Sequence, residues 1–208
     1  MANAPKKVVF IHGVSGPDLD KFNFLKRSIE KKLNVEVELF KWQSTWPYTI
    51  NKNLRLQPIR KMFARIFTDI EYALLHSFEM VETLPKADVY IGHSAGSIIA
   101  ISQPEKPAII FGSPIMLIET LNLRNQENKV QKIKSLLDTS RKILNIVCKE
   151  DIIAYPIESD NIENWTYSLA GLDLANVFFA HTSYFMNKKV SKKIVEALIS
   201  FGIEKRIT

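Results

Sequence analysis

Short, continuously apolar stretches recur along the chain and alternate with segments in which apolar residues repeat every three or four positions. The first pattern is typical of strands that are buried on both faces, and the second is typical of amphipathic helices. Six stretches predict strands: 7–11, 35–40, 87–91, 107–111, 143–148 and 176–180. Their alternation with helices predicts an α/β fold with a doubly wound, mostly parallel six-stranded sheet and helices on both faces.

The helical segments also carry end signals. Apolar residues between the first two strands predict a helix that Asp18 or Asp20 would cap. A stripe between the second and third strands predicts helix over 58–83, and because such a helix is long for a domain of this size we expect a break inside it. A last helix, over 190–201, has Gly202 as its C-cap candidate.

Length and composition indicate one globular domain over residues 1–208. Hydrophobic residues make up 46% of the chain and charged residues 24%, which excludes wholesale disorder. No apolar run approaches the roughly 20 residues that a membrane span needs. Cys148 is the one cysteine, so an intrachain disulfide and a multi-cysteine metal site are excluded. We expect a cytoplasmic location, and the oligomeric state stays open.

The formal net charge of +6 changes this picture little, because the basic residues are scattered. The densest run, at 188–193, opens the last helix and favours a solvated helix face. No nucleic-acid motif is present, so no nucleic acid is expected as a partner, whereas a weak contact with an anionic membrane surface stays open. Phosphate-loop, dinucleotide and zinc motifs are also missing from the sequence, and we expect no cofactor and no metal.

The motif that carries chemistry is Gly-His-Ser-Ala-Gly at 92–96. It follows the strand predicted over 87–91 and precedes an apolar helical segment, which is the context of a nucleophile elbow. In such an elbow a tight turn lifts the serine hydroxyl clear of the sheet, and glycines avoid collisions with the neighbouring strand and helix. This pattern predicts Ser94 as a nucleophile; a purely structural turn is the alternative.

With this motif the chain resembles the α/β-hydrolase family of serine hydrolases, whose members order their triad as serine, acid and histidine. The resemblance implies that His181, which alone among the four histidines follows Ser94, is the general base after the last strand. It implies Asp151, after the fifth strand, as the acid that holds the imidazole. Glu150 is the adjacent alternative. His93 is expected to support the turn.

The resemblance also implies an oxyanion hole made of backbone N–H groups. One would come from Ala95, directly after the nucleophile, and the other from Val14 in the loop after the first strand. We expect His12 to orient that loop rather than to act as a base. His12, Trp46 and Met116 are further candidates for the wall of a substrate pocket.

The resemblance is to a family in which many members begin with two extra antiparallel strands. In this chain the strand predicted over 7–11 already precedes the loop with Val14, so these N-terminal strands are expected to be missing. Only about thirty residues separate the fourth and fifth strands, enough for one or two helices but not for a large cap. The expected activity is hydrolysis of carboxylic esters with small to medium acyl groups through an acyl-enzyme. Amidase, peptidase or thioesterase chemistry with the same triad stays open, as does a non-catalytic binding protein on the same fold.

Overall fold

The computed structural model describes residues 4–13, 18–42, 58–120, 127–169 and 177–206. Six strands form one fully parallel sheet in the order β2-β1-β3-β4-β5-β6. The strands are β1 (Lys6–Ile11), β2 (Val35–Phe40), β3 (Val89–His93), β4 (Ala108–Phe111), β5 (Ile143–Cys148) and β6 (Ile162–Tyr167). The predicted α/β class with a six-stranded parallel sheet is therefore confirmed.

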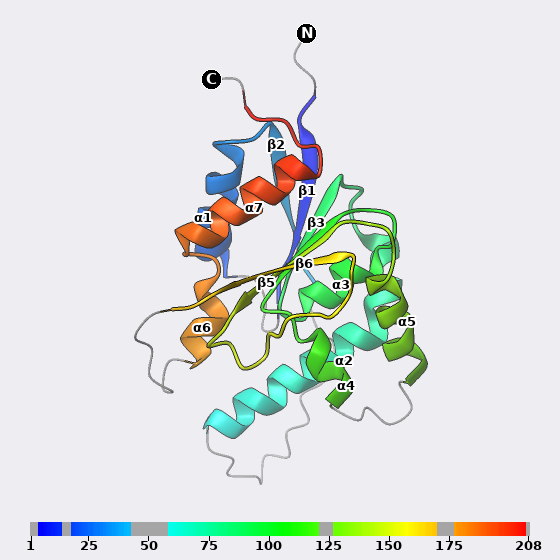
Figure 1. Cartoon of the computed structure of the whole chain (residues 1–208). Helices are drawn as coiled ribbons and strands as arrows, with labels where there is room; N and C mark the ends of the chain where they lie inside the picture. Colours follow the sequence, from blue (N-terminus) through cyan, green and yellow to red (C-terminus); the bar gives the residue numbers. More distant parts are fainter. Residues whose placement is uncertain (1–3, 14–17, 43–57, 121–126, 170–176, 207–208) are drawn as a thin grey trace.

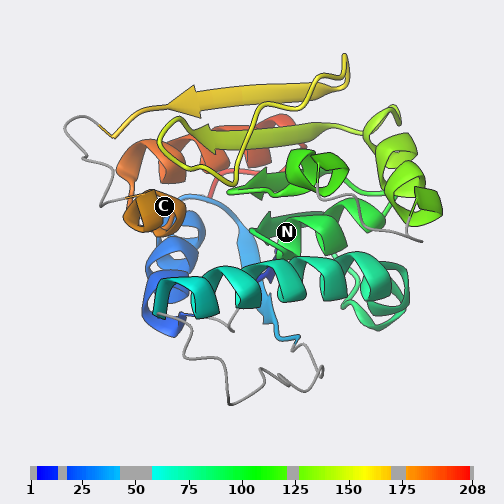
Figure 2. The ribbon, with the colours of Figure 1, turned by 90° about the horizontal axis from the view of Figure 1, so that it is seen from below.

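Helices cover both faces of the sheet (Figures 1 and 2). One face packs against α1 (Leu19–Glu30), α6 (Val177–Ser183) and α7 (Lys188–Ser200). The other packs against α2 (Pro58–Thr83), α3 (Gly96–Ser102), α4 (Ile115–Thr120) and α5 (Glu127–Leu137). The segment between β4 and β5 thus contains two short helices, as its length predicts.

Strand β1 shows why the strand sequences are continuously apolar. Val8 and Phe10 belong to the core under α1 and α7, whereas Val9 and Ile11 belong to the core under α2 and α3. All four are buried. Because neither face of the strand meets water, the alternation of polar and apolar residues that marks a half-exposed strand is lost.

The predicted helix ends are found at two places. The Asp18 side chain caps α1 by accepting a hydrogen bond from the Lys21 amide at 3.1 Å. Gly202 follows α7 with φ +91°, and its N–H donates to the Ile199 carbonyl at 2.9 Å. A positive φ at this position is accessible to glycine at little cost, so the residue ends the helix.

The prediction of a strand over 176–180 is wrong. Residues from Val177 onward form α6, and the sixth strand is β6. Strand β6 lies at the sheet edge, pairs only with β5 and exposes Glu163, Asn164 and Thr166, so its sequence lacks the apolar run of a central strand. A short apolar run is compatible with a buried helix as well as with a strand, and here it belongs to the helix.

The expected break inside the long second helix is also wrong. Helix α2 runs without interruption over 26 residues. It contains no glycine, and its one proline, Pro58, is its first residue, where the missing N–H costs nothing. Buried Ile70, Ala73 and Leu74 belong to the same core as α3, and the helix lies lengthwise across this side of the molecule (Figure 2).

The order of the strands places a candidate site. The chain adds β2 on one side of β1 and the remaining strands on the other, so β1 and β3 meet where the strand order reverses. Ile11 is paired with Gly92, and the loops after both strands therefore leave the sheet side by side. In open parallel sheets, ligands bind beyond the carboxyl ends of the strands at such a point.

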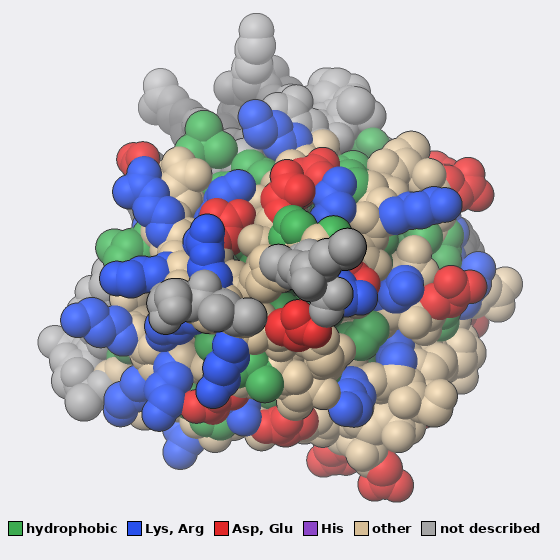
Figure 3. Space-filling model, turned by 90° about the horizontal axis from the view of Figure 1, so that it is seen from above, with side chains coloured by type: hydrophobic (Ala, Val, Ile, Leu, Met, Phe, Trp, Pro, Cys, Tyr) green, Lys and Arg blue, Asp and Glu red, His purple; other side chains and the backbone are tan. Residues whose placement is uncertain are grey.

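The opposite edge of the sheet, where the strands begin, has a different character. Figure 3 looks onto this end and shows Lys and Arg side chains interspersed with Asp and Glu. At the start of β1, Lys6 lies 3.2 Å from Asp88, which precedes β3. Across the described ranges, no helix has both the length and the hydropathy that a bilayer crossing requires.

Candidate active site

Ser94 lies in a tight turn between β3 and α3. Its φ of +54° is unusual for a residue with a side chain and is the only such value among the described non-glycine residues. The turn is held because the Ser94 N–H donates to the Phe111 carbonyl at 3.0 Å and the Ser94 carbonyl accepts from Ser97 Oγ at 2.6 Å. Left-handed backbone at a serine between strand and helix has the geometry expected of a nucleophile elbow.

The glycine that closes the motif is required by close packing. A Cβ on Gly96 would collide with the backbone carbonyl oxygens of Ile11 and His12. Helix α3 can therefore begin directly against the end of β1 only because position 96 has no side chain. The collision that the motif predicts for a side chain at position 96 is therefore found in the structure.

Asp151 and His181 meet at the end of β5. Asp151 Oδ2 accepts a hydrogen bond from His181 Nδ1 at 2.9 Å. His181 comes from α6 rather than from the end of a strand, which corrects the place expected for it. Glu150, the alternative acid, accepts hydrogen bonds from the Leu169 amide and the Ser168 hydroxyl instead. Of the two carboxylates, Asp151 is the one that contacts the histidine.

The surroundings of Asp151 keep it charged although it is only 3% exposed. Burial opposes ionisation and is the largest single effect on its pKa. Hydrogen bonds from His181, the Ile153 amide and the Tyr184 hydroxyl, together with the charge of His181, outweigh burial and leave the pKa below its ordinary value. In the neutral form of an imidazole, a carboxylate that faces Nδ1 keeps the proton on Nδ1 and leaves the lone pair at Nε2.

Two further atoms of this site are buried and have no partner. In the part of the chain that the structure describes, neither Ser94 Oγ nor His181 Nε2 forms a hydrogen bond. Both residues lie close to the end of β4, because the Ser94 amide donates to Phe111, and a Cβ on the next residue, Gly112, would lie 3.0 Å from His181 Cε1. A hydroxyl donor and an imidazole acceptor are thus both left available in one small region.

The side chain of His93, which was expected to support the turn, contacts His181. Its ring lies 5.0 Å from the ring of His181, and its Nε2–H donates to the His181 carbonyl at 3.1 Å. Burial, followed by the charge of His181, lowers the pKa of His93 to about 3. The residue therefore stays neutral and holds the backbone of His181 rather than exchanging protons.

His12 has a similar structural role in the loop after β1. Its Nε2 accepts a hydrogen bond from the Trp42 amide at 3.1 Å, so the proton lies on Nδ1, which donates to the Gly13 carbonyl at 2.6 Å. Burial lowers the pKa of His12. The Trp42 indole N–H in turn donates to the His12 carbonyl at 2.8 Å. These contacts join His12 and Gly13 to Trp42, and the expected orienting role of His12 for the rest of the loop stays a prediction.

The other predicted site residues divide into two groups. Ala95 is buried at the start of α3, and Met116 is partly buried in α4 against the core under α2 and α3. Val14 and Trp46 lie outside the described residues, so the second oxyanion donor and this part of the pocket stay predictions. Within the described segments, no group of three His, Cys, Asp or Glu side chains could hold a metal ion.

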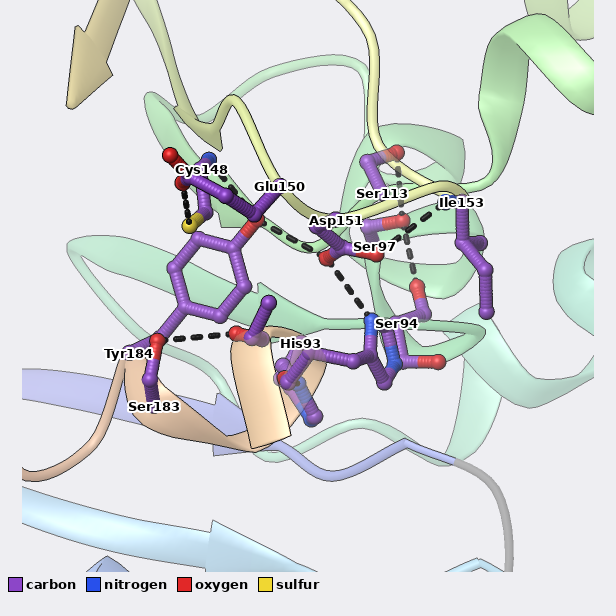
Figure 4. A network of polar contacts seen from close by, with 12 residues as sticks. His93, Ser94, Ser97, Ser113, Cys148, Glu150, Asp151, Ile153, Ser183 and Tyr184 are labelled. Atoms are coloured by element: carbon purple, nitrogen blue, oxygen red, sulfur yellow. Dashed lines mark hydrogen bonds and ion pairs between the residues drawn. The ribbon is translucent and has the colours of Figure 1, made fainter. Parts of the chain in front are cut away.

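Two residues that contact the candidate site, Tyr184 and Ser113, were not predicted from the sequence. Tyr184 donates a hydrogen bond to Asp151, and Ser113 Oγ lies 2.8 Å from Ser97 Oγ beneath the Ser94 turn (Figure 4). Neither forms a motif with the residue that it supports, because their partners are distant in sequence. The only local signal was the position of each just after a predicted site residue or at the end of a predicted strand.

No protein-family model and no curated protein matches the sequence. Among solved structures, the chain is similar to the monoacylglycerol lipase of Paleococcus ferrophilus, with 13% identity, 96% of this chain and 97% of that chain covered, and a TM-score of 0.53. The chain is also similar to TT1662 from Thermus thermophilus, with 12% identity and a TM-score of 0.50. This match covers 97% of this chain and 91% of that chain. A Bacillus cereus protein gives 14% identity and a TM-score of 0.50, and the chain spans 60% of its length.

At these identities the likeness shows the fold. The parallel sheet, the helices on both faces and these neighbours define the chain as a protein with the α/β-hydrolase fold. The resemblance inferred from the sequence is confirmed at this level.

Proposed function

We propose that this protein is a serine hydrolase that cleaves carboxylic esters of small to medium acyl groups. The observation that carries the proposal is the arrangement of one histidine. His181 Nδ1 donates to an ionised Asp151, while its Nε2 and the hydroxyl of the strained Ser94 are buried without partners among the described residues. A base and a nucleophile that are both unsatisfied and held in one region favour chemistry over a structural role.

In this mechanism Ser94 Oγ attacks the acyl carbonyl carbon and its proton passes to His181 Nε2. The Asp151 carboxylate stabilises the imidazolium, which then protonates the departing alcohol. Water, deprotonated by the same nitrogen, attacks the acyl-enzyme and releases the acid. The required bond from Ser94 Oγ to His181 Nε2 would form as the substrate binds, since catalytic hydrogen bonds often tighten only in the substrate complex.

The developing oxyanion would accept hydrogen bonds from the backbone N–H of Ala95, at the start of α3, and from that of Val14. The ester preference draws on the name of one structural neighbour, a monoacylglycerol lipase, and on the two short helices between β4 and β5, which leave no large cap in the described chain. Thioester and amide cleavage use the same residues, and the test below separates them.

The test is a chain-length series of p-nitrophenyl esters, beside thioester and amide analogues. Ser94→Ala and His181→Ala should each lower kcat/KM on the best ester by about 10³-fold or more. Ser191→Ala is the matched control, because Ser191 Oγ is also buried without a described partner but belongs to α7, whereas His181 belongs to α6. It should retain the activity of the unmodified protein.

Each alternative predicts a different result. A preference for thioesters or amides over every ester of the series would replace the ester assignment. Turnover of no acyl compound, combined with salt-sensitive binding to anionic vesicles, would instead support a non-catalytic binding protein.

A further inference from the structure

Tyr184 lies between the end of β5 and the candidate triad. It is fully buried, and its hydroxyl takes part in two hydrogen bonds of opposite direction. The Cys148 N–H donates to Tyr184 Oη at 3.0 Å, and Tyr184 Oη donates to Asp151 Oδ2 at 2.9 Å. Figure 4 shows the phenol directed at the loop that carries Asp151. The hydroxyl therefore links the carboxylate to the backbone of a central strand.

The ring of Tyr184 has little freedom to move this hydroxyl. It lies 5.5 Å from the ring of Phe111 and 5.7 Å, edge to face, from the ring of Tyr167. Its Cε2 is 3.3 Å from the position that a Cβ on Gly112 would take. Packing from β4 and β6 thus determines where the hydroxyl lies.

The carboxylate of Asp151 uses both of its oxygens. Oδ1 accepts from the Ile153 amide at 3.0 Å, and Oδ2 accepts from both His181 Nδ1 and Tyr184. The Ile153 contact alone would let the carboxylate turn about the bond to its Cβ. The Tyr184 contact is on the same oxygen that faces His181, so it fixes the orientation that matters for the imidazole.

We propose that Tyr184 is a positioning residue of the triad, which holds Asp151 Oδ2 toward His181 by linking it to the backbone of Cys148. This inference rests on the proposed function for its kinetic consequences. The linkage itself concerns only the Asp151–His181 contact and can be tested without substrate.

The titratable groups around the carboxylate set the sign of the pH effect. His181 and Tyr184 face Asp151 directly, His93 lies behind His181, and Cys148 and Glu150 belong to the same loop end but bond to each other. Loss of the tyrosine donor removes one contact that favours the charged carboxylate, and the pKa of Asp151 should rise.

The decisive variant is Tyr184→Phe, which keeps the ring and removes the hydroxyl. The matched control is Tyr167→Phe, since Tyr167 is also buried but its hydroxyl lies 3.1 Å from Ser183 Oγ. On the best p-nitrophenyl ester, Tyr184→Phe should lower kcat about 10-fold with KM changed less than about two-fold. Tyr167→Phe should leave both kcat and KM within about two-fold of the unmodified protein. Melting temperatures of both variants account for any loss of stability.

A second measurement does not depend on activity. In the ¹⁵N-labelled protein, the His181 Nδ1–H should give a downfield proton signal that Tyr184→Phe moves upfield or broadens and Tyr167→Phe leaves unchanged. If the unmodified protein hydrolyses no ester, the proposed function fails but this signal still decides the role of Tyr184. An unchanged signal in Tyr184→Phe, with or without activity, would overturn the inference.

Discussion

Replacement of Gly112 by alanine tests how closely the end of β4 constrains the candidate base. Gly112 has φ +59°, and a Cβ there would lie 3.0 Å from His181 Cε1 and 3.3 Å from both His181 Nδ1 and Tyr184 Cε2. All three distances are shorter than ordinary van der Waals contacts. The imidazole must therefore shift by a few tenths of an ångström. Because both rings are hydrogen-bonded to Asp151, this shift disturbs the contact between His181 and Asp151.

The substitution should affect both the stability of the protein and the rate of hydrolysis. Left-handed backbone costs a residue with a Cβ roughly 1–2 kcal/mol, which for a domain of this size lowers the melting temperature by about 2–8 °C. Displacement of His181 should lower the rate more than the stability, since misplacement of a catalytic group by about 1 Å can lower the rate 10²-fold. We expect Gly112→Ala to lower kcat/KM for p-nitrophenyl butyrate by about 10- to 100-fold.

Gly202→Ala is the control that separates the two effects. Gly202 also has a positive φ, +91°, but a Cβ there would meet nothing within 4 Å. Thermal melts should show a loss of stability in both variants, and the ester assay should show a loss of activity in Gly112→Ala alone. Full activity in Gly112→Ala, or an equal loss in both variants, would show that the end of β4 does not constrain the position of His181.

Three further changes probe the acid, the neutral histidine and the helix behind the nucleophile. Asp151→Asn should lower kcat/KM about 10³- to 10⁴-fold in the ester assay, whereas Glu150→Gln should cost less than about 10-fold; equal losses would contradict the assignment of the acid. The pKa of buried His93 is about 3, below that of an unfolded histidine, so its stabilising contribution is complete above about pH 6.5 and is lost as the pH falls toward 3. In urea unfolding, His93→Gln should therefore lose about 2 kcal/mol less than the unmodified protein between pH 7 and pH 5, and an identical loss would argue against a neutral His93. Arg141→Met should lower the free energy of unfolding by about 3 kcal/mol, because the buried guanidinium donates to the carbonyls of Ile101, Gln103 and Leu136 behind α3; unchanged stability would show that these bonds contribute nothing.

Strands β1, β3, β4 and β5 could be predicted because burial on both faces leaves a strong local pattern. Strand β2, at one edge of the sheet, could be predicted because buried valines alternate with glutamates along it. Strand β6 could not, since an edge strand with exposed Glu163, Asn164 and Thr166 does not resemble the others. From Val177 onward, the run with the predicted strand belongs to α6, whose Ala180 is buried in the same core as α1 and α7. The run is too short for its apolar pattern to distinguish a strand from a buried helix.

The site shows the same division between local and tertiary information. The turn at Ser94 has a local signature, because glycines and a strand-to-helix change are needed at fixed spacing. The contact between Asp151 and His181 spans 30 residues and was reached through chain order and a family resemblance. Tyr184 and Ser113 act through contacts that depend on how β4, β5 and α6 pack together, and no spacing rule identifies such partners.

Mapping of a covalent adduct by mass spectrometry, after treatment with a fluorophosphonate, tests directly whether Ser94 is the nucleophile. We expect one adduct, on the peptide that contains Ser94, with none on Ser191. Labelling should disappear in Ser94→Ala and become at least 10²-fold slower in His181→Ala. An adduct elsewhere, or equal labelling of Ser94→Ala and the unmodified protein, would contradict it.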